Sequence, residues 1–254
     1  MNNKITTKYT DWRLLGTKTL QEDWTHPTTD KVYKAGSPIE LVGSVNYDGF
    51  HTLDFPIPSM TSLFLSQAYE DWTASQHFLT EEEFLDKPDK TDVSTVIHPK
   101  EDYIFFSLLQ QRMVAIVFAY TALESFANES IPETYIFKRL RDDKKCTEEF
   151  NKEQAEHLSL DTKLHEVLPL IFGIKSPKGT IVWQKYISLK KLRDRIIHMK
   201  SKDKEPSKPR DETIWSELLN KSYPNLALEA KAVIGYYLDS LPTKPRWFIE
   251  FWDK

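Results

Sequence analysis

The sequence predicts a mainly α-helical protein, in which a helical bundle follows an N-terminal α+β extension containing a short hairpin. Two observations carry this prediction. Apolar residues recur at helical spacing in several segments after residue 100. Before it, two short β-type runs, 39–42 and 44–47, flank Gly43, and the Asp-Gly pair at 48–49 is a turn signal. The chain has 254 residues, of which 40% are hydrophobic and 28% charged, so it is large enough to bury a core without cross-links.

The first hundred residues contain few periodic patterns. The predicted hairpin lies within 39–55 and ends at Pro56, because proline cannot donate to a sheet ladder. Short helices are expected at 62–72 and 81–85. The segment 87–100 has two prolines and few apolar residues, so it is interpreted as a linker. We therefore expect residues 1–99 to form an N-terminal region, to which the sequence assigns no role.

The strongest helix signal runs from residue 102 to about 130. Its apolar stripe steps by three and four residues through Leu109, Met113, Ile116, Tyr120, Leu123 and Ala127. Pro132 closes this helix, because the residue before a proline avoids helical backbone angles. The charged segment 133–157 is expected to be partly helical. A second apolar segment, 158–172, has Ser159 or Asp161 as its N-cap, and Pro169 predicts a kink in it or its early end.

A further helix is expected over 180–199, with Thr180 as its cap. Its predicted buried stripe consists of Val182, Tyr186, Leu189, Leu192, Ile196 and Met199. A polar loop follows to residue 210, then a short helix at 211–219 and a last helix at 226–241, each ended near a proline. Residues 100–242 thus predict a bundle of four or five helices. Residues 243–254 form an aromatic C-terminal tail.

Composition and motifs exclude several kinds of site. The single Cys146 excludes an internal disulfide and a cysteine zinc cluster, and it fits a reducing cytoplasm. The chain lacks phosphate-loop, dinucleotide-binding, His-Glu-x-x-His and hydrolase-elbow motifs, so no cofactor and no metal are expected. No signal peptide is visible, and no segment approaches the roughly 18 apolar residues of a membrane span. We therefore expect a cytoplasmic protein that does not contact a membrane.

Positive charge is concentrated in one segment of an acidic chain. Between residues 175 and 210 there are 12 Lys and Arg residues and 3 acidic ones, although the whole chain has a net charge of −4. Such a segment can bind phosphate groups locally. Among its basic residues, the ones expected to contact a nucleic acid are Lys190, Lys191, Lys200 and Lys202. The alternative interpretation is a solvated helix face followed by a charged loop.

Within this segment, Arg193, Asp194 and His198 form a set with catalytic potential. Histidine titrates near neutral pH, so it can take a proton from a ribose 2′-hydroxyl or give one to a leaving oxygen. Arginine can hold a phosphate and stabilise its charge. Asp194 lies four residues before His198, where it could orient the imidazole. On an ideal helix Arg193 and His198 project roughly 140° apart, and Arg195 lies nearer to His198. The alternative is an exposed basic helix end.

The stretch Arg193-Asp194-Arg195-Ile196-Ile197-His198 resembles the Arg-x(4–6)-His motif of the HEPN superfamily. The run 120–129, Tyr-Thr-Ala-Leu-Glu-Ser-Phe-Ala-Asn-Glu, is similar to the first core helix of many bacterial HEPN proteins, and the helix around 227–232 matches their closing one. The resemblance covers roughly residues 100–242, a little over half of the chain.

The resemblance implies a HEPN-like helical bundle that dimerises, with the two motifs meeting in a composite cleft. It implies a metal-independent endoribonuclease acting on RNA, often a toxin or antiviral effector with an antitoxin or regulatory protein as partner. Arg193 and His198 would be the catalytic pair, with Asp194 as the polar motif residue and Glu124, Asn128 and Arg195 in support. Two alternatives stay open: a non-catalytic HEPN-like module that binds a protein or nucleotide partner, and an unrelated helical enzyme or structural protein.

Overall fold

The computed structural model describes residues 11–15, 17–19, 23–25, 30–35, 38–40, 42–81, 84–86, 97–140, 147–205 and 213–251. Helices hold about 55% of these residues, and the sheets they form have two strands each. The prediction of a mainly α protein is therefore confirmed. The chain divides into two compact units, Met1–Leu63 with Thr243–Lys254, and Phe64–Pro242. This division differs from the predicted one at residue 100, because the second unit also takes in most of the first long helix.

The first unit is built from short antiparallel strand pairs. Its strands are β1 (Thr17–Thr19), β2 (Trp24–Thr25), β3 (Val32–Tyr33), β4 (Pro38–Glu40), β5 (Val42–Asn46) and β6 (Thr52–Pro56). β1 pairs with β4, β2 with β3, and β5 with β6. The β5–β6 hairpin confirms the hairpin predicted within 39–55. Its turn places Gly49 at φ 86°, in the left-handed region that glycine adopts without strain.

The aromatic tail belongs to this first unit. Helix α9 (Arg246–Ile249) follows Pro245, and Trp247 and Phe251 are buried. The ring of Phe251 lies edge to face against Trp12, with 5.7 Å between the centroids. This geometry is favoured between aromatic rings, so the two ends of the chain are held in one unit by their aromatic residues.

Helix α1 (Met60–Glu81) is much longer than the helix predicted at 62–72. It is followed by the strand pair β7 (Leu85–Asp86) and β8 (His98–Pro99), so the separate helix predicted at 81–85 is wrong at residues 84 and 85, and Glu81 is the last residue of α1. The buried side of α1 includes Ser66 and Ser75. Because serine is polar, these positions interrupt the apolar pattern by which a buried helix face is recognised in a sequence. Ser75 donates its hydroxyl to the carbonyl of Trp72 at 2.7 Å, which satisfies it inside the fold.

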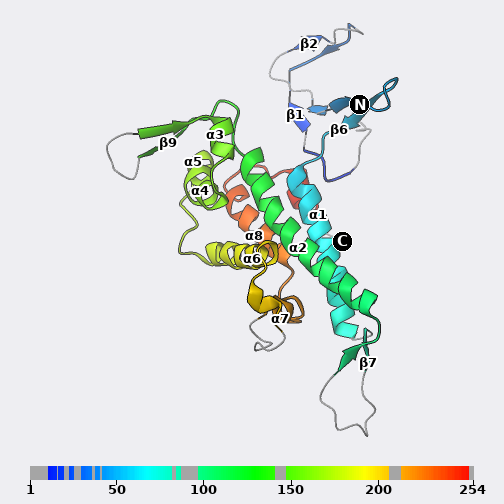
Figure 1. The fold of residues 1–254 in the computed structure, drawn as a ribbon. Helices are drawn as coiled ribbons and strands as arrows, with labels where there is room; N and C mark the ends of the chain where they lie inside the picture. The colour runs from blue at the N-terminus through cyan, green and yellow to red at the C-terminus, as the bar shows by residue number, and fades with distance from the viewer. Residues whose placement is uncertain are drawn as a thin grey trace. The chain divides into compact units, whose positions relative to one another are not determined.

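Helix α2 (Asp102–Glu129) confirms the strongest helix prediction and lies beside α1 in the second unit (Figure 1). The rings of Phe64 and Phe118 meet edge to face at 5.4 Å between α1 and α2. By length and composition α2 could cross a membrane, with a mean hydropathy of 1.4 over 18 residues. By this measure the expectation that no segment approaches a membrane span is wrong, because the average hydropathy of α2 tolerates the polar residues that interrupt its apolar runs. The core helix of a water-soluble domain passes the same test, and α2 packs on α6 and α8.

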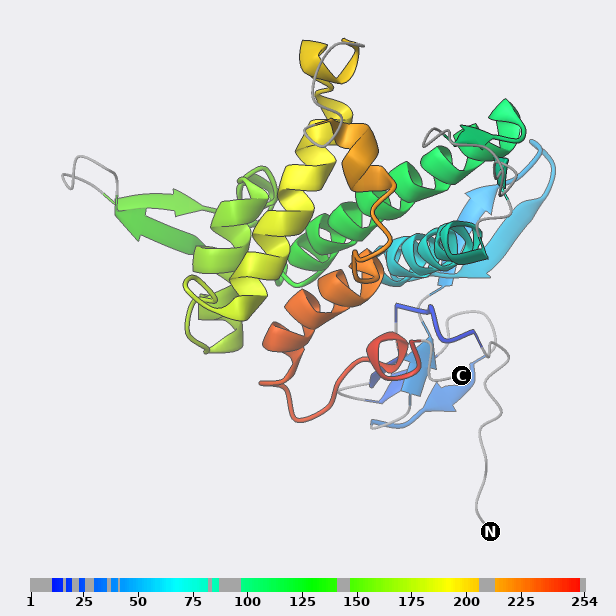
Figure 2. The same ribbon diagram turned by 90° about the horizontal axis from the view of Figure 1, so that it is seen from below.

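Helices α6 (Ile181–Ile197) and α8 (Leu226–Leu238) complete the core of the second unit, and Figure 2 shows them side by side. α2, α6 and α8 each contact the other two. The residues of the α6 stripe that are buried are Tyr186, Leu189, Leu192 and Ile196. Thr180 caps α6 as predicted, since its hydroxyl accepts the N–H of Trp183 at 3.3 Å. Both helices begin where predicted and end two or three residues early.

The segment before α6 differs most from the prediction. Strands β9 (Phe137–Leu140) and β10 (Thr147–Phe150) form a hairpin in a stretch expected to be partly helical, and α3 (Lys152–Glu156) follows it. Next come α4 (Leu160–Thr162), a π-helical turn η1 (Lys163–Val167) and α5 (Leu168–Phe172). Ser159 caps α4, one of the two predicted caps. Pro169 lacks an N–H, and the distortion predicted around it takes the form of this π turn.

After α6 the chain makes a single 3₁₀ turn, η2 (Ser201–Asp203), and then the short helix α7 (Ile214–Leu218). α7 falls within the helix predicted at 211–219, of which residues 211–212 lie outside the described part of the chain. The loop at 206–210 lies outside it as well. Ile214 and Leu218 are buried, so α7 is anchored by two apolar side chains.

Candidate functional site

The end of α6 places the Arg193–His198 segment where the buried stripe stops. Helix α6 finishes at Ile197, and His198 is its C-cap with φ −115° and ψ 58°. The His198 N–H still donates to the carbonyl of Asp194 at 2.9 Å, so the backbone leaves the helix only after that bond. Because His198 has left helical geometry, the roughly 140° separation from Arg193 on an ideal helix does not describe this site.

The imidazole of His198 is exposed to solvent. Among the described residues it has no hydrogen-bond or ion-pair partner, so Asp194 does not orient it through its carboxylate. A surface histidine without partners keeps both ring nitrogens accessible to a ligand. The proposed orienting role of Asp194 is therefore not seen in this structure.

Arg193 is partly exposed and makes two contacts within the second unit. Its Nη1 donates to Oδ1 of Asp194 at 3.0 Å, and its guanidinium lies over the ring of Tyr120 on α2, 4.9 Å from the centroid. Burial raises the pKa of Tyr120, the charge of Glu124 adds to that effect, and the positive charge of Arg193 opposes it. Tyr120 thus fixes the direction in which the arginine leaves α6.

Arg195 contacts the segment that follows α6 and not the residues around Arg193. Its Nη2 donates to Oδ1 of Asp203 at 3.1 Å, and its Nη1 lies 3.7 Å from Oε1 of Glu217. The side chain of Asp203 is 0% exposed and also accepts the N–H of Ile214 at 2.7 Å. The carbonyl of Asp203 accepts the indole N–H of Trp215 at 2.8 Å. Arg195 therefore holds the post-helix chain against α7, a role that spacing alone does not indicate.

Glu124 and Asn128 lie on α2 near a buried lysine. The Nζ of Lys163, in the π turn, donates to Oδ1 of Asn128 at 2.7 Å and to the carbonyl of Glu156 at 2.8 Å. Burial lowers the pKa of Lys163, and the charges of Glu124 and Glu156 oppose that shift. Asn128 thus holds η1 against α2. Neither Glu124 nor Asn128 has a hydrogen bond to Arg193 or His198 among the described residues.

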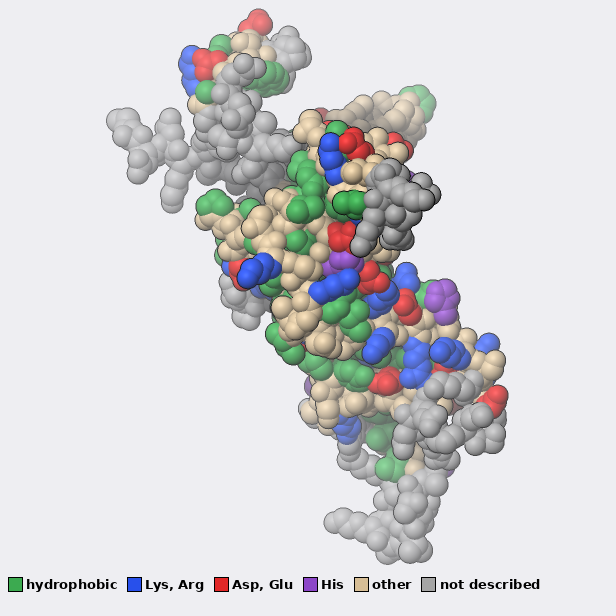
Figure 3. Space-filling model, turned by 90° about the vertical axis from the view of Figure 1, so that its left-hand side faces the viewer, with side chains coloured by type: hydrophobic (Ala, Val, Ile, Leu, Met, Phe, Trp, Pro, Cys, Tyr) green, Lys and Arg blue, Asp and Glu red, His purple; other side chains and the backbone are tan. Residues whose placement is uncertain are grey.

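The basic residues expected to contact nucleic acid differ in their surroundings. Lys190 donates to Asp161, which also accepts the hydroxyl of Tyr186, so this lysine is held within the fold. Lys191 and Lys200 are exposed. The side chain of Lys202 lies outside the described part of the structure. Figure 3 shows Lys and Arg side chains gathered on one face with Asp and Glu side chains between them.

The described residues contain no group of three or more His, Cys, Asp and Glu side chains placed to hold a metal ion. His157 is exposed at the C-cap of α3. His165 lies against Glu166, with 3.3 Å between Nε2 and Oε1, and meets Trp183 edge to face at 5.9 Å. Burial and the charge of Lys178 lower the pKa of His165. Its surroundings are those of a histidine packed against an aromatic ring.

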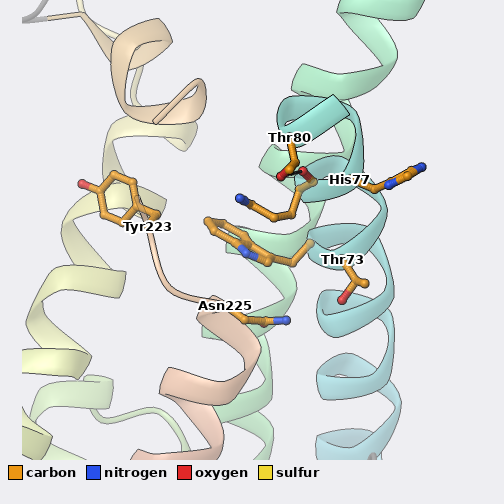
Figure 4. Close-up of a pocket in the computed structure, with 7 residues that line it drawn as sticks. Thr73, His77, Thr80, Tyr223 and Asn225 are labelled. Carbon is orange, nitrogen blue, oxygen red and sulfur yellow. Dashed lines mark hydrogen bonds between the residues drawn. The ribbon is translucent and has the colours of Figure 1, made fainter. Parts of the chain in front are cut away.

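A pocket that the sequence did not indicate lies between α1 and the start of α8 (Figure 4). Its volume is about 430 Å³. The residues that line it are Trp72, Thr73, Gln76, His77, Thr80, Tyr223 and Asn225. Behind it lies Arg112, which is buried in the middle of the apolar helix α2. The sequence carried one signal for the burial of Arg112, which lies three residues after Leu109 and four before Ile116 of the predicted stripe, on the same helix face.

Comparison of the chain with protein-family models, with characterised proteins and with solved structures gave no match. The function of the site must therefore be argued from its residues.

Proposed function

We propose that this protein is a metal-independent endoribonuclease of HEPN type, with His198 and Arg193 as its catalytic pair. The observation that carries the proposal is the exposed imidazole of His198 at the end of α6, five residues after the partly exposed Arg193. A histidine whose ring nitrogens are open to solvent can exchange protons with a substrate. The concentration of Lys and Arg between residues 175 and 210 supplies the attraction for a phosphodiester backbone.

The chemistry requires a base, an acid and a phosphate ligand. His198 takes the proton of a ribose 2′-hydroxyl, whose oxygen attacks the adjacent phosphorus and displaces the 5′-oxygen of the next nucleotide. Arg193 stabilises the charge on the phosphate oxygens. A second histidine, from another copy of the chain, protonates the leaving oxygen. The products are a 2′,3′-cyclic phosphate and a 5′-hydroxyl, and no metal enters the reaction.

The packing of α2, α6 and α8 supports the HEPN-like bundle, since these are the helices that carry the resemblance. Under this proposal the active form is a homodimer in which two Arg193–His198 segments meet in one cleft. A cytoplasmic toxin or antiviral effector, restrained by an antitoxin or regulatory protein, is the corresponding biology. Exposed Lys191 and Lys200 would contact the RNA backbone.

The test is RNA cleavage by purified protein in EDTA, with His198→Ala as the catalytic variant. His157→Ala is a matched control, because His157 is also an exposed C-cap histidine. We expect wild type and the control to cut RNA and leave cyclic phosphate ends, with the rate of His198→Ala lower by about a hundredfold or more. RNA with a 2′-deoxyribose at the cut position should resist. Equal cutting by His198→Ala would refute the assignment of the site.

A cellular experiment tests the proposed biology. Wild type and His198→Ala are overexpressed at matched levels, and growth and total RNA integrity are compared. We expect slowed growth and fragmented RNA only with wild type. Equal growth with intact RNA in both strains would contradict a toxin that acts unaided.

One observation favours a non-catalytic HEPN-like module as the second candidate. The guanidinium of Arg193 is already engaged by Asp194 and by the face of Tyr120, so phosphate must compete with an internal carboxylate. A binding module would show no RNA cleavage and would co-purify with a stoichiometric protein or nucleotide partner. Size-exclusion chromatography with mass spectrometry of the purified complex distinguishes the two functions.

A further inference from the structure

Arg112 carries a positive charge inside the second unit. It lies on α2 with 1% of its surface exposed. Its guanidinium covers the indole of Trp72 at 3.9 Å from the ring centroid, and its Nη2 donates to Oε1 of Gln76 at 2.5 Å. Both partners belong to α1. The arginine therefore reaches from α2 towards α1, where an aromatic face and an amide oxygen receive it.

Trp72 and Gln76 are both uncharged, so they do not neutralise the positive charge of Arg112. Among the described residues, no carboxylate forms an ion pair with Arg112, and its Nε has no hydrogen-bond partner. Burial lowers the pKa of the guanidinium to about 10, which leaves it charged at neutral pH. A buried charge without a counter-ion is costly, and such groups are usually satisfied by a partner or retained for a function.

The two residues that Arg112 contacts are also lining residues of the pocket between α1 and the start of α8. Trp72 and Gln76 separate the guanidinium from a space of about 430 Å³. Figure 4 shows His77 pointing away from this space, while the side chain of Asn225 points towards α1 and the hydroxyl of Tyr223 points away from it. The lining residues include no Asp, Glu, Lys or Arg, and the guanidinium of Arg112 contacts two of them from behind.

Gln76 links the charge to the pocket. Its Oε1 accepts from Arg112, which fixes its Nε2 as the outward donor, and that Nε2 now donates to the carbonyl of Lys221 at 3.2 Å. A hydrogen bond from a cation polarises the amide, so its Nε2 becomes a stronger donor. The same Nε2 can serve an anionic acceptor in the pocket.

Two further features affect the electrostatic potential in the pocket. Asn225 is the N-cap of α8, and the positive end of a helix dipole favours anions. Tyr223 donates its hydroxyl to Glu217, whose negative charge lies near the pocket. Arg195 lies 3.7 Å from that carboxylate, and it also pairs with Asp203 at 3.1 Å. The positive contributions at the pocket are therefore the guanidinium of Arg112 and the N-terminal end of α8.

We propose that this pocket binds the oxyanion group, phosphate or carboxylate, of a small molecule, with Gln76 as the direct donor and Arg112 as the charge behind it. A space of about 430 Å³ suits a small molecule and lies in the usual range of ligand pockets. The site involves neither Arg193 nor His198, so it is a binding site beyond the proposed ribonuclease.

The test is calorimetric titration of the full-length protein with inorganic phosphate and, separately, benzoate, at constant ionic strength set by sodium chloride. We expect one of these probes to bind and to raise the unfolding temperature. Arg112→Met should weaken that binding by about tenfold or more. The variant should fold, because replacing a buried unpaired charge by an apolar side chain of similar length is often neutral or stabilising.

A second variant keeps the test decisive if Arg112→Met fails to fold. Thr73 lines the pocket from an exposed position, so Thr73→Phe fills the space without touching Arg112 and should abolish binding. Arg139→Met is the control for loss of a positive charge, because Arg139 lies on the β9 strand and pairs with Glu148. Absence of binding of both probes to wild type, or equal binding to wild type and Thr73→Phe, overturns the proposal.

Discussion

Arg195 and Asp203 form an ion pair that fixes the chain directly after helix α6. The Nη2 of Arg195 lies 3.1 Å from Oδ1 of Asp203, whose side chain is 0% exposed. The same carboxylate accepts the N–H of Ile214 at 2.7 Å and that of Lys200 at 3.2 Å. Lys200 follows His198 by only two residues, so the backbone of the exposed histidine is placed by an interaction in which its own side chain takes no part.

Removing the charge of Asp203 should destabilise the second unit. Asp203→Asn puts an amide in place of one acceptor oxygen and leaves Arg195 without its buried partner. Unsatisfied buried donors cost about 1–3 kcal/mol each, so we expect a loss of about 2 kcal/mol in the free energy of unfolding. Urea denaturation followed by circular dichroism measures it. Glu153→Gln, an exposed change on α3, is the control and should stay within about 0.5 kcal/mol of wild type.

The contribution of Asp203 should also depend on pH. Burial alone would raise the pKa of this carboxyl, but hydrogen bonds from the N–H groups of Ile214 and Lys200 and from Arg195 lower it below its usual value. A lowered pKa means that the stabilisation is complete above the unfolded-state value of about 3.9 and is lost as pH falls through the folded-state value. The stability gap between wild type and Asp203→Asn should therefore be constant near neutral pH and shrink below about pH 4. A gap that widens in acid would contradict this.

Two neighbouring tyrosines on α8 offer a matched test of how the π turn is held. The hydroxyl of Tyr237 is buried and donates to the carbonyl of Leu164 at 2.6 Å, while the half-buried Tyr236 donates to the carbonyl of Lys175 at 2.9 Å in a hydrogen bond that is exposed to solvent. Tyr237→Phe leaves a buried carbonyl without its donor and should cost about 1–2 kcal/mol. Tyr236→Phe should cost less than about 0.5 kcal/mol, because water replaces the lost bond. Equal losses in thermal unfolding would show that burial is not the deciding factor.

If the protein is a ribonuclease, the ring of Tyr120 should matter for activity through Arg193. A cation held over an aromatic face gains about 0.5–2 kcal/mol. Tyr120→Leu removes the ring and should lower kcat for RNA cleavage about fivefold, whereas Tyr120→Phe keeps the ring and should stay near wild type. Single-turnover cleavage at saturating protein isolates kcat from binding. A similar loss in both variants would assign the effect to the hydroxyl instead.

The helices of the core could be predicted from the sequence because each has an apolar stripe of helical period. The hairpin β9–β10 could not, because charged residues such as Lys138 and Glu149 cover its outer side and pair only across the strands, with 2.6 Å between Nζ and Oε1. The buried side of α1 contains Ser66 and Ser75, whose packing depends on tertiary contacts. For the same reason the pocket in front of Arg112 was missed, since its lining comes from segments about 150 residues apart in the chain.

The two arginines of the Arg193–His198 segment look alike in the sequence but have different neighbours in the structure. Arg193 is 29% exposed and contacts Asp194 and the face of Tyr120, whereas Arg195 is paired with the buried carboxylate of Asp203. Their removal should therefore affect different properties.

Arg193→Ala should keep the free energy of unfolding within about 1 kcal/mol of wild type, because partly exposed ion pairs contribute little. It should lower RNA cleavage by about a hundredfold or more if the guanidinium stabilises the phosphate. Arg195→Ala leaves a buried carboxylate without its cation and should cost about 3 kcal/mol of stability. At a temperature where it remains folded, it should cut RNA at a rate closer to wild type. Urea unfolding and cleavage assays on the same preparations give both values. A reversed order, with Arg195→Ala inactive but stable, would move the catalytic arginine to position 195 and make Arg193 the structural one.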